Sequence, residues 1–493
     1  MLKSGGDEID SADSTPSLGR SISLGQFSPL LNPFPRRLLL IALDWTRPKD
    51  PPVALGHASI VARLREAGVL VTARSWSVHD ADFNVDLVVD FIRQNNASGV
   101  DLGIGVFVWN ELYVQAILSR VRALAFKGRI ILGGSQVSYT KSGLEDYYPN
   151  ANVFIRGYGE EALAALMLSS SAFPSIQGVH YAGQFDHRLS AVADLALLPS
   201  PYLTGVLSPQ KFLRIEFQRG CPFRCAFCQH RESDDSKVRR HFASSRILSE
   251  IDWLCDHAVV DDVAVLDPIF NTGPMYMSVL RRFVERRYKG KLSLQCRLEL
   301  VTPEFLTLVE EFNEHGRATL EFGLQTIHPE EERHIQRLNH LGKVQDVLRQ
   351  TATRGIQTEV SLIFGLPAQT VNSFRSTVNY CKELRVPTIC AYPLRLYRGT
   401  PLYEMKEDLG LIESTEPHFH LLKDKHIGHV VQSPSFSLSD WYLMAAIARE
   451  LDDYNAQNAA CCKVERKMPA TPSNTLFRGD EEACSRHGNL DLG

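Results

Sequence analysis

The chain has 493 residues, of which 44% are hydrophobic and 22% charged, and its 53 Lys and Arg against 57 Asp and Glu give a formal net charge of −4. This balance is typical of a globular protein with a sizeable core, and the length predicts roughly two to four domains. The charge gives no basic excess to attract nucleic acid or an anionic membrane, and no run approaches the roughly 20 apolar residues of a membrane span. We therefore expect a cytoplasmic protein whose partners include neither a membrane nor a nucleic acid.

Residues 1–36 are rich in Ser, Gly and Asp and lack the basic start and apolar core of a secretory signal, so they predict a disordered tail. From residue 37 to 172, short apolar runs such as RLLLIALD alternate with helical periods such as ALGHASIVARLREAG. Strands and helices that alternate with short connections favour an open, parallel, doubly wound (Rossmann-like) sheet, which binds ligands at the carboxyl ends of its strands.

The loops at these predicted strand ends therefore supply the candidate ligand-binding residues of the first domain. Glycine occurs at three of the four ends and allows the backbone to approach a ligand closely, although an ordinary turn glycine is the alternative at any single loop. The candidates are Asp44, Trp45, Gly105, Gly133, Gly134, Ser135, Gly157, Tyr158, Gly159 and Glu160.

An irregular segment with Pro and Ser, residues 173–211, predicts a linker, and a second strand–helix series occupies residues 212–405. Six predicted strands in succession favour a partial (β/α)6 barrel of the TIM type, whose site lies at the carboxyl ends of its strands. Residues 406–462 predict a small, mostly helical region with one good helix in LSDWYLMAAIARELDDYNAQ, and the polar residues 463–493 predict a disordered tail.

Directly after the first barrel strand, the stretch RGCPFRCAFC places Cys221, Cys225 and Cys228 in a C-x3-C-x2-C pattern. Three thiolates on one loop can hold a four-iron cluster and leave one iron open to a substrate or cofactor. A zinc site that borrows His230 is the alternative, although no second knuckle is present. Inert buried thiols are a further alternative, which the Gly and Pro of the loop disfavour. The other cysteines are interpreted as core residues (Cys255, Cys296, Cys381, Cys390) or as incidental thiols of the C-terminal stretch (Cys461, Cys462, Cys484).

The stretch RGCPFRCAFC resembles the C-x3-C-x-aromatic-C signature of the radical S-adenosylmethionine (SAM) superfamily, with Phe227 as the aromatic residue. This resemblance implies a [4Fe–4S] cluster on the three cysteines, SAM bound to the open iron, and reductive cleavage of SAM to a 5′-deoxyadenosyl radical. The preceding domain, with ILGG and RGYGEEAL, makes residues 37–405 similar to the radical SAM enzymes that carry an N-terminal cobalamin-binding domain.

Cobalamin is therefore implied at the strand ends of the first domain. The D-x-H-x-x-G element that supplies a histidine to cobalt in other cobalamin enzymes is absent from this sequence, which the resemblance interprets as binding without a protein histidine. His57 and His79 lie near the first strands, but surface or core positions are the expectation for both.

The same resemblance implies SAM contacts at the ends of the barrel strands. The candidates are Phe227, Asp267, Arg297, Glu321, Gln325, Phe364, Gly365 and Arg395. An Arg can pair with the carboxylate of SAM, and a Glu or Gln can bind its ribose hydroxyls. A network of Arg and Glu that closes the barrel mouth is the structural alternative, and for Asp267 a cap on the next helix is the alternative to a contact with the SAM amino group.

The resemblance implies a cobalamin-dependent radical SAM methyltransferase, which moves a methyl group from SAM through methylcobalamin to an unactivated carbon or to phosphorus of a small molecule or peptide. An external electron donor of the flavodoxin or ferredoxin type is expected as a partner. A rearrangement or cyclisation enzyme without methyl transfer is one alternative, and a non-catalytic metal-binding module is another. A methylthiotransferase is disfavoured because residues 37–170 contain no cysteine.

Overall fold

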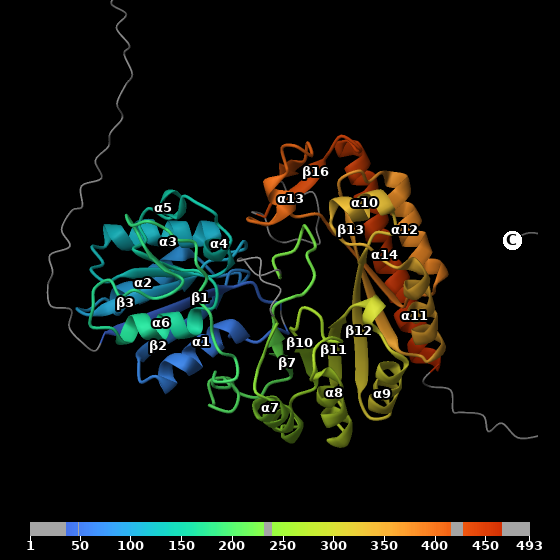
Figure 1. The fold of residues 1–493 in the computed structure, drawn as a ribbon, viewed down its shortest axis with the longest axis horizontal. Helices are drawn as coiled ribbons and strands as arrows, with labels where there is room; N and C mark the ends of the chain where they lie inside the picture. The colour runs from blue at the N-terminus through green and yellow to red at the C-terminus, as the bar shows by residue number, and fades with distance from the viewer. Residues whose placement is uncertain (1–35, 48, 231–238, 416–426, 466–493) are drawn as a thin grey trace, which may run out of the picture.

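The computed structural model describes residues 36–47, 49–230, 239–415 and 427–465. The predicted tails fall largely outside these ranges, as do Cys484 and the side chains of Cys461 and Cys462. The described residues form two open sheets that lie side by side, each covered by helices (Figure 1). None of the described helices combines the length and apolar character needed to cross a membrane.

The N-terminal sheet has the strand order β2-β1-β3-β4-β5-β6, and all its neighbours are parallel except β5 and β6. Its strands are β1 (Arg37–Asp44), β2 (Leu70–Ser77), β3 (Val100–Gly105), β4 (Ile130–Gly133), β5 (Val153–Ile155) and β6 (Val179–Tyr181). The strand β6 corrects one prediction, because it comes from the segment 173–211, which we expected to be an irregular linker. Three ladder pairs hold it antiparallel to β5.

Helices cover both faces of this sheet because the side chains of a strand alternate in direction. Leu38 and Leu40 of β1 join a core cluster with α1 and α6, whereas Leu39, Ile41 and Leu43 join a second cluster with α2 and α3. The strand is therefore apolar on both faces, as a doubly wound sheet requires. The helices are α1 (Leu55–Glu66), α2 (Val85–Gln94), α3 (Glu111–Ala123), α4 (Ser135–Ser138), α5 (Leu144–Tyr147) and α6 (Gly159–Leu168).

The second sheet has the parallel order β14-β13-β12-β11-β10-β7, so that β7 and β14 form its two edges and the barrel is partial. Its strands are β7 (Phe212–Ile215), β10 (Asp262–Val265), β11 (Lys291–Cys296), β12 (Arg317–Gln325), β13 (Gln357–Phe364) and β14 (Thr388–Pro393). The helices packed around it are α7 (Ser244–Asp256), α8 (Tyr276–Glu285), α9 (Pro303–Asn313), α10 (Pro329–His334), α11 (Leu341–Thr353) and α12 (Val371–Glu383), with the 3-10 turn η1 (Leu298–Leu300) after β11. Thr302 caps α9, since its hydroxyl accepts the amide of Phe305 at 3.2 Å.

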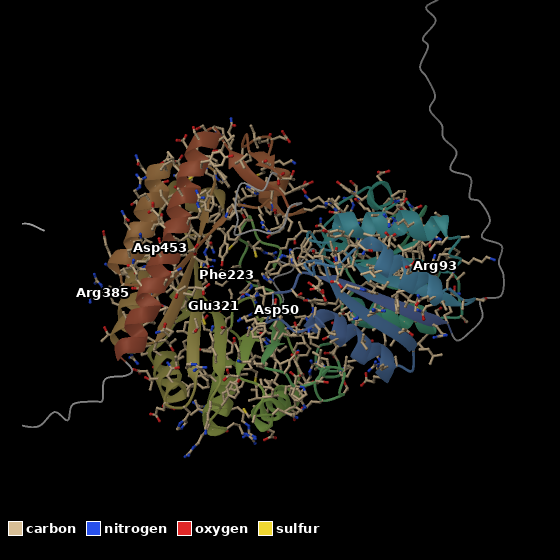
Figure 2. All side chains as sticks on the ribbon, turned by 180° about the vertical axis from the view of Figure 1, so that it is seen from behind. Asp50, Arg93, Phe223, Glu321, Arg385 and Asp453 are labelled. Atoms are coloured by element: carbon tan, nitrogen blue, oxygen red, sulfur yellow. The ribbon has the colours of Figure 1, made fainter. Side chains whose placement is uncertain are left out.

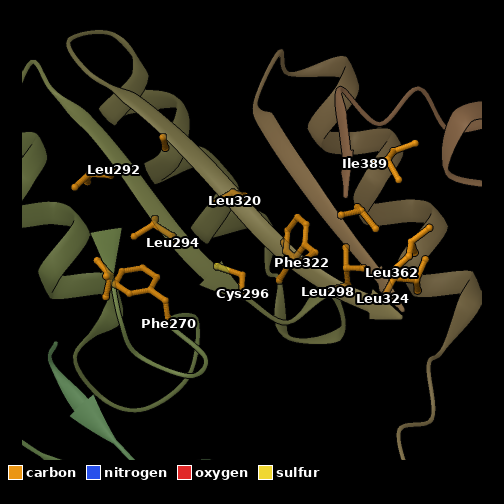
Figure 3. Packing of buried hydrophobic residues seen from close by; sticks show 14 of the residues in the cluster. Phe270, Leu292, Leu294, Cys296, Leu298, Leu320, Phe322, Leu324, Leu362 and Ile389 are labelled. Atoms are coloured by element: carbon orange, nitrogen blue, oxygen red, sulfur yellow. The ribbon is translucent and has the colours of Figure 1, made fainter. Parts of the chain in front are cut away.

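The two faces of the barrel strands differ. Along β12 and β13 every second residue is buried, and these residues (Leu320, Phe322, Leu324, Leu362) pack outward against the helices (Figure 3). The positions between them are mostly half-buried and mostly polar. Glu321 of β12 and Glu359 of β13 are two of these residues, and they lie opposite each other on the neighbouring strands. The concave side of the sheet is therefore a polar surface, whereas the hydrophobic core of the domain lies between sheet and helices.

Residues after β14 fold back onto the barrel. The short α13 (Pro401–Glu404) precedes an antiparallel hairpin of β15 (Ile412–Ser414) and β16 (His429–Gln432), and α14 (Leu438–Glu465) packs on β14 and α12. The hairpin was not predicted for a region expected to be mostly helical. It continues the sheet locally, because the amide of Val430 donates to the carbonyl of Leu394 at 2.8 Å.

Asp101 of β3 generates a prediction about the stability of the N-terminal domain. Its fully buried carboxylate pairs with Arg36 and, at 2.8 Å, with Arg129. Asp101→Asn removes the buried negative charge that these two guanidinium groups share, so the free energy of unfolding should fall by about 3 kcal/mol. Asp86→Asn is the matched control, because the ion pair of Asp86 with Arg120 is exposed and should contribute about 1 kcal/mol or less. Urea denaturation measures both, and equal shifts would contradict the prediction.

Candidate functional site

The three cysteines of the C-x3-C-x2-C pattern lie on one loop, here called the cluster loop (residues 220–228), at the carboxyl end of the barrel sheet. It follows the short strand β8 (Gln218–Arg219), which pairs with β9 (Arg240–His241). Backbone bonds fix its course, since the amide of Ala226 donates to Ile335 at 2.8 Å and its carbonyl accepts from Leu402 at 3.0 Å. Phe223 of this loop lies between the barrel and the N-terminal domain (Figure 2).

The thiols of the cluster loop are close enough to influence one another electrostatically. Cys225 is buried, and Cys221 and Cys228 are half-buried. Burial, and then the neighbouring thiols, raise the pKa of Cys221 and of Cys228, the latter to about 12. The chain alone therefore keeps the thiols of Cys221 and Cys228 protonated, and a bound cation is what deprotonates a coordinating thiol. Among the described residues no three His, Cys, Asp or Glu side chains converge closely enough to hold a single metal ion.

Two guanidinium groups stand beside the thiols. Arg337 donates through Nη1 to the Cys225 sulfur at 3.7 Å and through Nη2 to the carbonyl of Gly323, and its Nε is buried without a partner. Arg297 lies over the Phe223 ring, with its guanidinium carbon 3.8 Å from the ring centre. Positive charge of this kind stabilises thiolates. Three thiols on one loop beside two cations fit an anionic thiolate-bound iron–sulfur group.

Arg337 was missed in the sequence analysis. It follows α10, twelve residues after Gln325 in the stretch QTIHPEEERHIQR. The available signal was an Arg in a loop after a predicted strand end, but sequence spacing alone does not show that α10 turns the chain back onto the cluster loop.

Of the predicted SAM-binding residues, Arg297 reaches Phe223 of the cluster loop, and Gln325 lies near Arg337. Arg297 pairs with Glu299 at 3.0 Å, as the alternative of an Arg–Glu network also anticipates. Gln325 ends β12 with φ of 71°, a left-handed conformation that is costly for a residue with a side chain and that recurs at functional sites. A Cβ on Gly323 would lie 2.5 Å from Nε2 of Gln325. The Gln325 side chain therefore folds back toward Gly323, whose carbonyl accepts from Arg337.

Asp267 has a structural task in this arrangement. Its buried carboxylate accepts the amides of Phe217 at 2.7 Å and Gln218 at 3.2 Å, and so braces the strand segment that leads into the cluster loop. The predicted alternative of a helix cap is wrong, because α8 begins at Tyr276 with Met275 as its N-cap. Phe227, the aromatic residue of the motif, is half-buried against the barrel core. Their contacts with SAM stay predictions.

The remaining SAM candidates lie farther along the barrel. Glu321 was expected at a strand end but lies in the middle of β12, level with Gln295 and Glu359 on its neighbours. The Phe364 side chain is fully buried in an aromatic cluster with Phe374 and Trp441, so only its backbone and that of Gly365 can face a ligand. Arg395 is half-buried just beyond β14.

The carboxyl edge of the N-terminal sheet carries half-buried aromatic side chains. Trp45 meets His79 edge to face with ring centres 5.2 Å apart, and Phe107 stacks on Trp109 at 4.7 Å. Asp44 ends β1 beneath them with a buried Oδ2 that has no partner, and burial raises its pKa to about 6. An apolar, partly open edge with one unsatisfied buried acceptor fits a large flat organic cofactor such as cobalamin.

The glycines at this edge are explained in part by packing. Gly134 has φ of 94°, and a Cβ there would lie 2.5 Å from the Val106 carbonyl, while a Cβ on Gly157 would lie 2.6 Å from that of Ala191. Internal contacts therefore require glycine at both positions without a ligand. Gly133 and Gly105 end β4 and β3, Ser135 begins α4, and Gly159 begins α6.

Tyr158 and Glu160, also predicted to bind cobalamin, face the barrel. Glu160 is buried and pairs with Arg219 at 2.8 Å, and the same guanidinium lies over the Tyr158 ring at 5.1 Å. The Glu160 carboxylate is thus engaged by the barrel, which was not anticipated because the two residues are 59 positions apart in the sequence.

Comparison with known proteins matches residues 215–381 to the family model of the radical SAM superfamily. The cobalamin-dependent radical SAM methyltransferase TokK of Streptomyces tokunonensis is 25% identical over 339 residues, which are 63% of this chain and 49% of that protein. A solved structure of TsrM, a radical SAM methyltransferase from Kitasatospora setae with cobalamin and a [4Fe–4S] cluster bound, aligns with a TM-score of 0.64 at 16% identity, over 84% of this chain and 89% of that one.

A structure of OxsB, a cobalamin-dependent SAM radical enzyme with cobalamin and SAM bound, aligns with a TM-score of 0.62 at 14% identity, over 88% of this chain and 71% of that one. These structures share the fold, in which a doubly wound domain precedes a partial barrel. The chain spans about half the length of the first curated relatives that it matches.

The environment of Asp267 predicts a pH dependence of stability. Burial raises the pKa of Asp267 from 3.8 to about 7. Between these values the unfolded carboxyl is ionised and the folded one is protonated, so its contribution to stability is lost as the pH rises through this window. Asp267→Asn removes the dependence, and from pH 5 to pH 7 the variant should gain about 2 kcal/mol relative to the unchanged protein. Urea midpoints at the two pH values measure this gain, and a constant difference would contradict it.

Proposed function

We propose that this chain, a radical SAM enzyme related to cobalamin-dependent radical SAM methyltransferases, transfers a methyl group from SAM to an unactivated carbon or to phosphorus of a small molecule or peptide, with cobalamin as the carrier. The observation that carries the proposal is the meeting of two carboxyl edges: the cluster loop of the barrel lies against the edge of the N-terminal sheet, where the Tyr139 hydroxyl donates to the carbonyl of Gln229. The two cofactors of such a reaction would be bound at these edges.

Cys221, Cys225 and Cys228 would hold the cluster, which supplies the electron for SAM cleavage when it is bound and leaves one iron open to SAM. Arg337 would bind the SAM carboxylate, a role supported by its buried Nε, which has no partner, and by its Nη1, which donates to the Cys225 sulfur. Arg297 adds a second cation on the Phe223 side.

Other groups would position the rest of SAM. The amide of Gln325 would meet the ribose hydroxyls, since the left-handed backbone at the end of β12 holds it beside Arg337. The backbone at Gly365 would flank the adenine. Its φ is 84°, and a Cβ there would lie 3.2 Å from the Val430 carbonyl, so this position has room for backbone alone.

Cobalamin would lie on the aromatic edge of the N-terminal sheet, with Trp45, Gly105, Gly133 and Ser135 as its contacts, and it would supply a carrier for the methyl group. His79 packs edge to face against Trp45, so the edge presents the rings of both residues. The methyl acceptor is proposed as a small molecule or a peptide.

A rearrangement or cyclisation without methyl transfer is the second candidate, favoured by the likeness in fold to OxsB, which is described as a cobalamin-dependent SAM radical enzyme. Product mass separates the two: methyl transfer adds one methylene unit, whereas rearrangement leaves the mass unchanged and cyclisation lowers it by hydrogen.

The cluster assignment is tested by Cys225→Ala. After anaerobic reconstitution the unchanged protein should be brown, with about four irons per chain, and should cleave SAM reductively to 5′-deoxyadenosine. The variant should lose at least about tenfold in both readouts, because even residues that only support a metal ligand cost that much. Cys255→Ala is the control, since that thiol lies on α7, away from the loop. Full iron content and cleavage in the Cys225 variant would overturn the assignment.

The SAM assignment is tested by Arg337→Met. Loss of a charge-assisted hydrogen bond should raise the Kd for SAM on the order of tenfold or more, while the iron content stays within about twofold. Equilibrium dialysis with radiolabelled SAM on the reconstituted protein gives the Kd. Arg354→Met, which removes contacts with Glu310 at 2.7 Å and with Thr307 at 3.4 Å, should bind SAM as the unchanged protein does. Unaltered affinity in the Arg337 variant would remove this residue from the site.

A further inference from the structure

The cluster loop is tied to the N-terminal domain before its first cysteine. Arg219, two residues before Cys221, extends its guanidinium, on a side chain that is 12% exposed, to Glu160 at 2.8 Å and to Glu216 at 2.6 Å. It lies between the rings of Tyr158, at 5.1 Å, and Phe242, at 5.5 Å. Glu160 is the second residue of α6, directly after the carboxyl end of β5. One end of the loop is therefore held by a carboxylate of the other domain.

The loop is tied a second time directly after its last cysteine. The carbonyl of Gln229 accepts from the hydroxyl of Tyr139, the C-cap of α4, and its side chain donates to the carbonyl of Arg398 at 2.9 Å. Arg398 in turn enters the N-terminal domain, where Glu111 accepts from it at 3.1 and 3.3 Å and Thr140 at 3.2 Å.

The two domains are also in close backbone contact in this region. Gly399 has φ of 75°, and a Cβ there would lie 2.4 Å from the Tyr139 carbonyl. The backbones of the two domains thus touch beside the last cysteine, and a side chain at this position would separate them. Both ties come from α4 and α6, the helices that begin at the Gly133–Ser135 and Gly157–Glu160 strand ends.

We propose that Glu160 and Tyr139 are positioning residues that clamp the cluster loop at its two ends against the carboxyl edge of the N-terminal sheet. The inference rests on the proposed function in one respect: the clamp matters for the reaction because it fixes the separation of cluster and cobalamin. A site must be held to about 0.5 Å for productive geometry, and buried, multiply bonded groups lock a loop better than exposed pairs do.

Two other ion pairs between the domains involve no residue of this loop or of its two ties. Lys49 meets Asp262 at 3.2 Å, and Asp50 meets Arg214 at 2.9 Å. Asp262 is the first residue of β10, so the Lys49 pair holds the domains together at the opposite, amino end of the barrel strands. Lys49→Met is therefore the matched control, a variant that breaks a contact between the domains without touching the clamp.

The first test uses the full chain, reconstituted with the cluster alone, and compares Glu160→Gln, Tyr139→Phe and Lys49→Met by hydrogen exchange and mass spectrometry. Peptides that cover residues 219–230 should exchange at least about tenfold faster in both clamp variants, while peptides from β12 and β13 and the Lys49 variant stay unchanged. Unchanged exchange of the loop in the Tyr139 variant, which removes one hydroxyl and should fold normally, would overturn the proposal.

The second test adds cobalamin and measures the dipolar coupling between the reduced cluster and Co(II) by pulsed electron paramagnetic resonance. The clamp variants should give a broader or displaced distance distribution, with iron and cobalt content unchanged, and the Lys49 variant should not. A distribution identical to that of the unchanged protein would overturn the positioning role. If the unchanged protein binds no cobalamin while the loop exchange responds as expected, the proposed function fails and the clamp stands.

Discussion

Arg219 is a charge that the fold has buried between its two domains, and the site is arranged around it. An isolated buried guanidinium would be strongly unfavourable, so the carboxylates of Glu160 and Glu216 must both be present. Glu160 belongs to the N-terminal domain, and Glu216 directly follows β7 in the barrel segment that leads to the cysteines. The requirement to neutralise one charge therefore fixes the edges of two sheets against each other, which a flexible linker between domains would not do.

The concave side of the barrel sheet also carries charged and polar side chains. TIM-type barrels usually fill their interior with layers of branched apolar side chains, but here the inward positions of β12 and β13 hold Glu321, Glu359 and Ser361 at intermediate exposure. Burial and the neighbouring Glu359 raise the pKa of Glu321. The hydrophobic core lies on the outer face of the sheet, where helices cover it. The inner face is available to polar ligands, and the cluster loop lies at its carboxyl end.

Several features of the site followed from local sequence. The three cysteines and the strand before them could be placed because their spacing is short and the chain between them is a single loop. The Thr302 cap is local in the same sense, since its partner amide is three residues away. Arg297 and Glu299, two residues apart, pair at 3.0 Å, in keeping with the Arg–Glu network considered as an alternative. Interactions within a few residues depend on backbone geometry that propensity and spacing can predict.

Other features needed contacts between distant segments. Nothing local marks Arg337 as a neighbour of Cys225, because α10 and the turn after it decide where that guanidinium points. The position of Asp267 in the sequence is compatible both with a helix cap and with a bond to a neighbouring strand segment. Only the fold shows that its carboxyl accepts the amides of Phe217 and Gln218. Gly134 and Gly157 look like ligand-binding glycines in the sequence, whereas neighbouring carbonyls explain them.

Local patterns in the chain were enough to predict the two strand–helix series, the doubly wound and partial-barrel sheets that they form, and the cysteine loop at the carboxyl end of the second, because periodicity and short motifs are local properties. The residues that face one another across the domain boundary emerged only from the folded arrangement. Glu160 and Arg219, or Glu111 and Arg398, carry no mutual signal in the chain. Their pairing is determined by how the two domains pack, because a charge removed from water needs an opposite charge beside it.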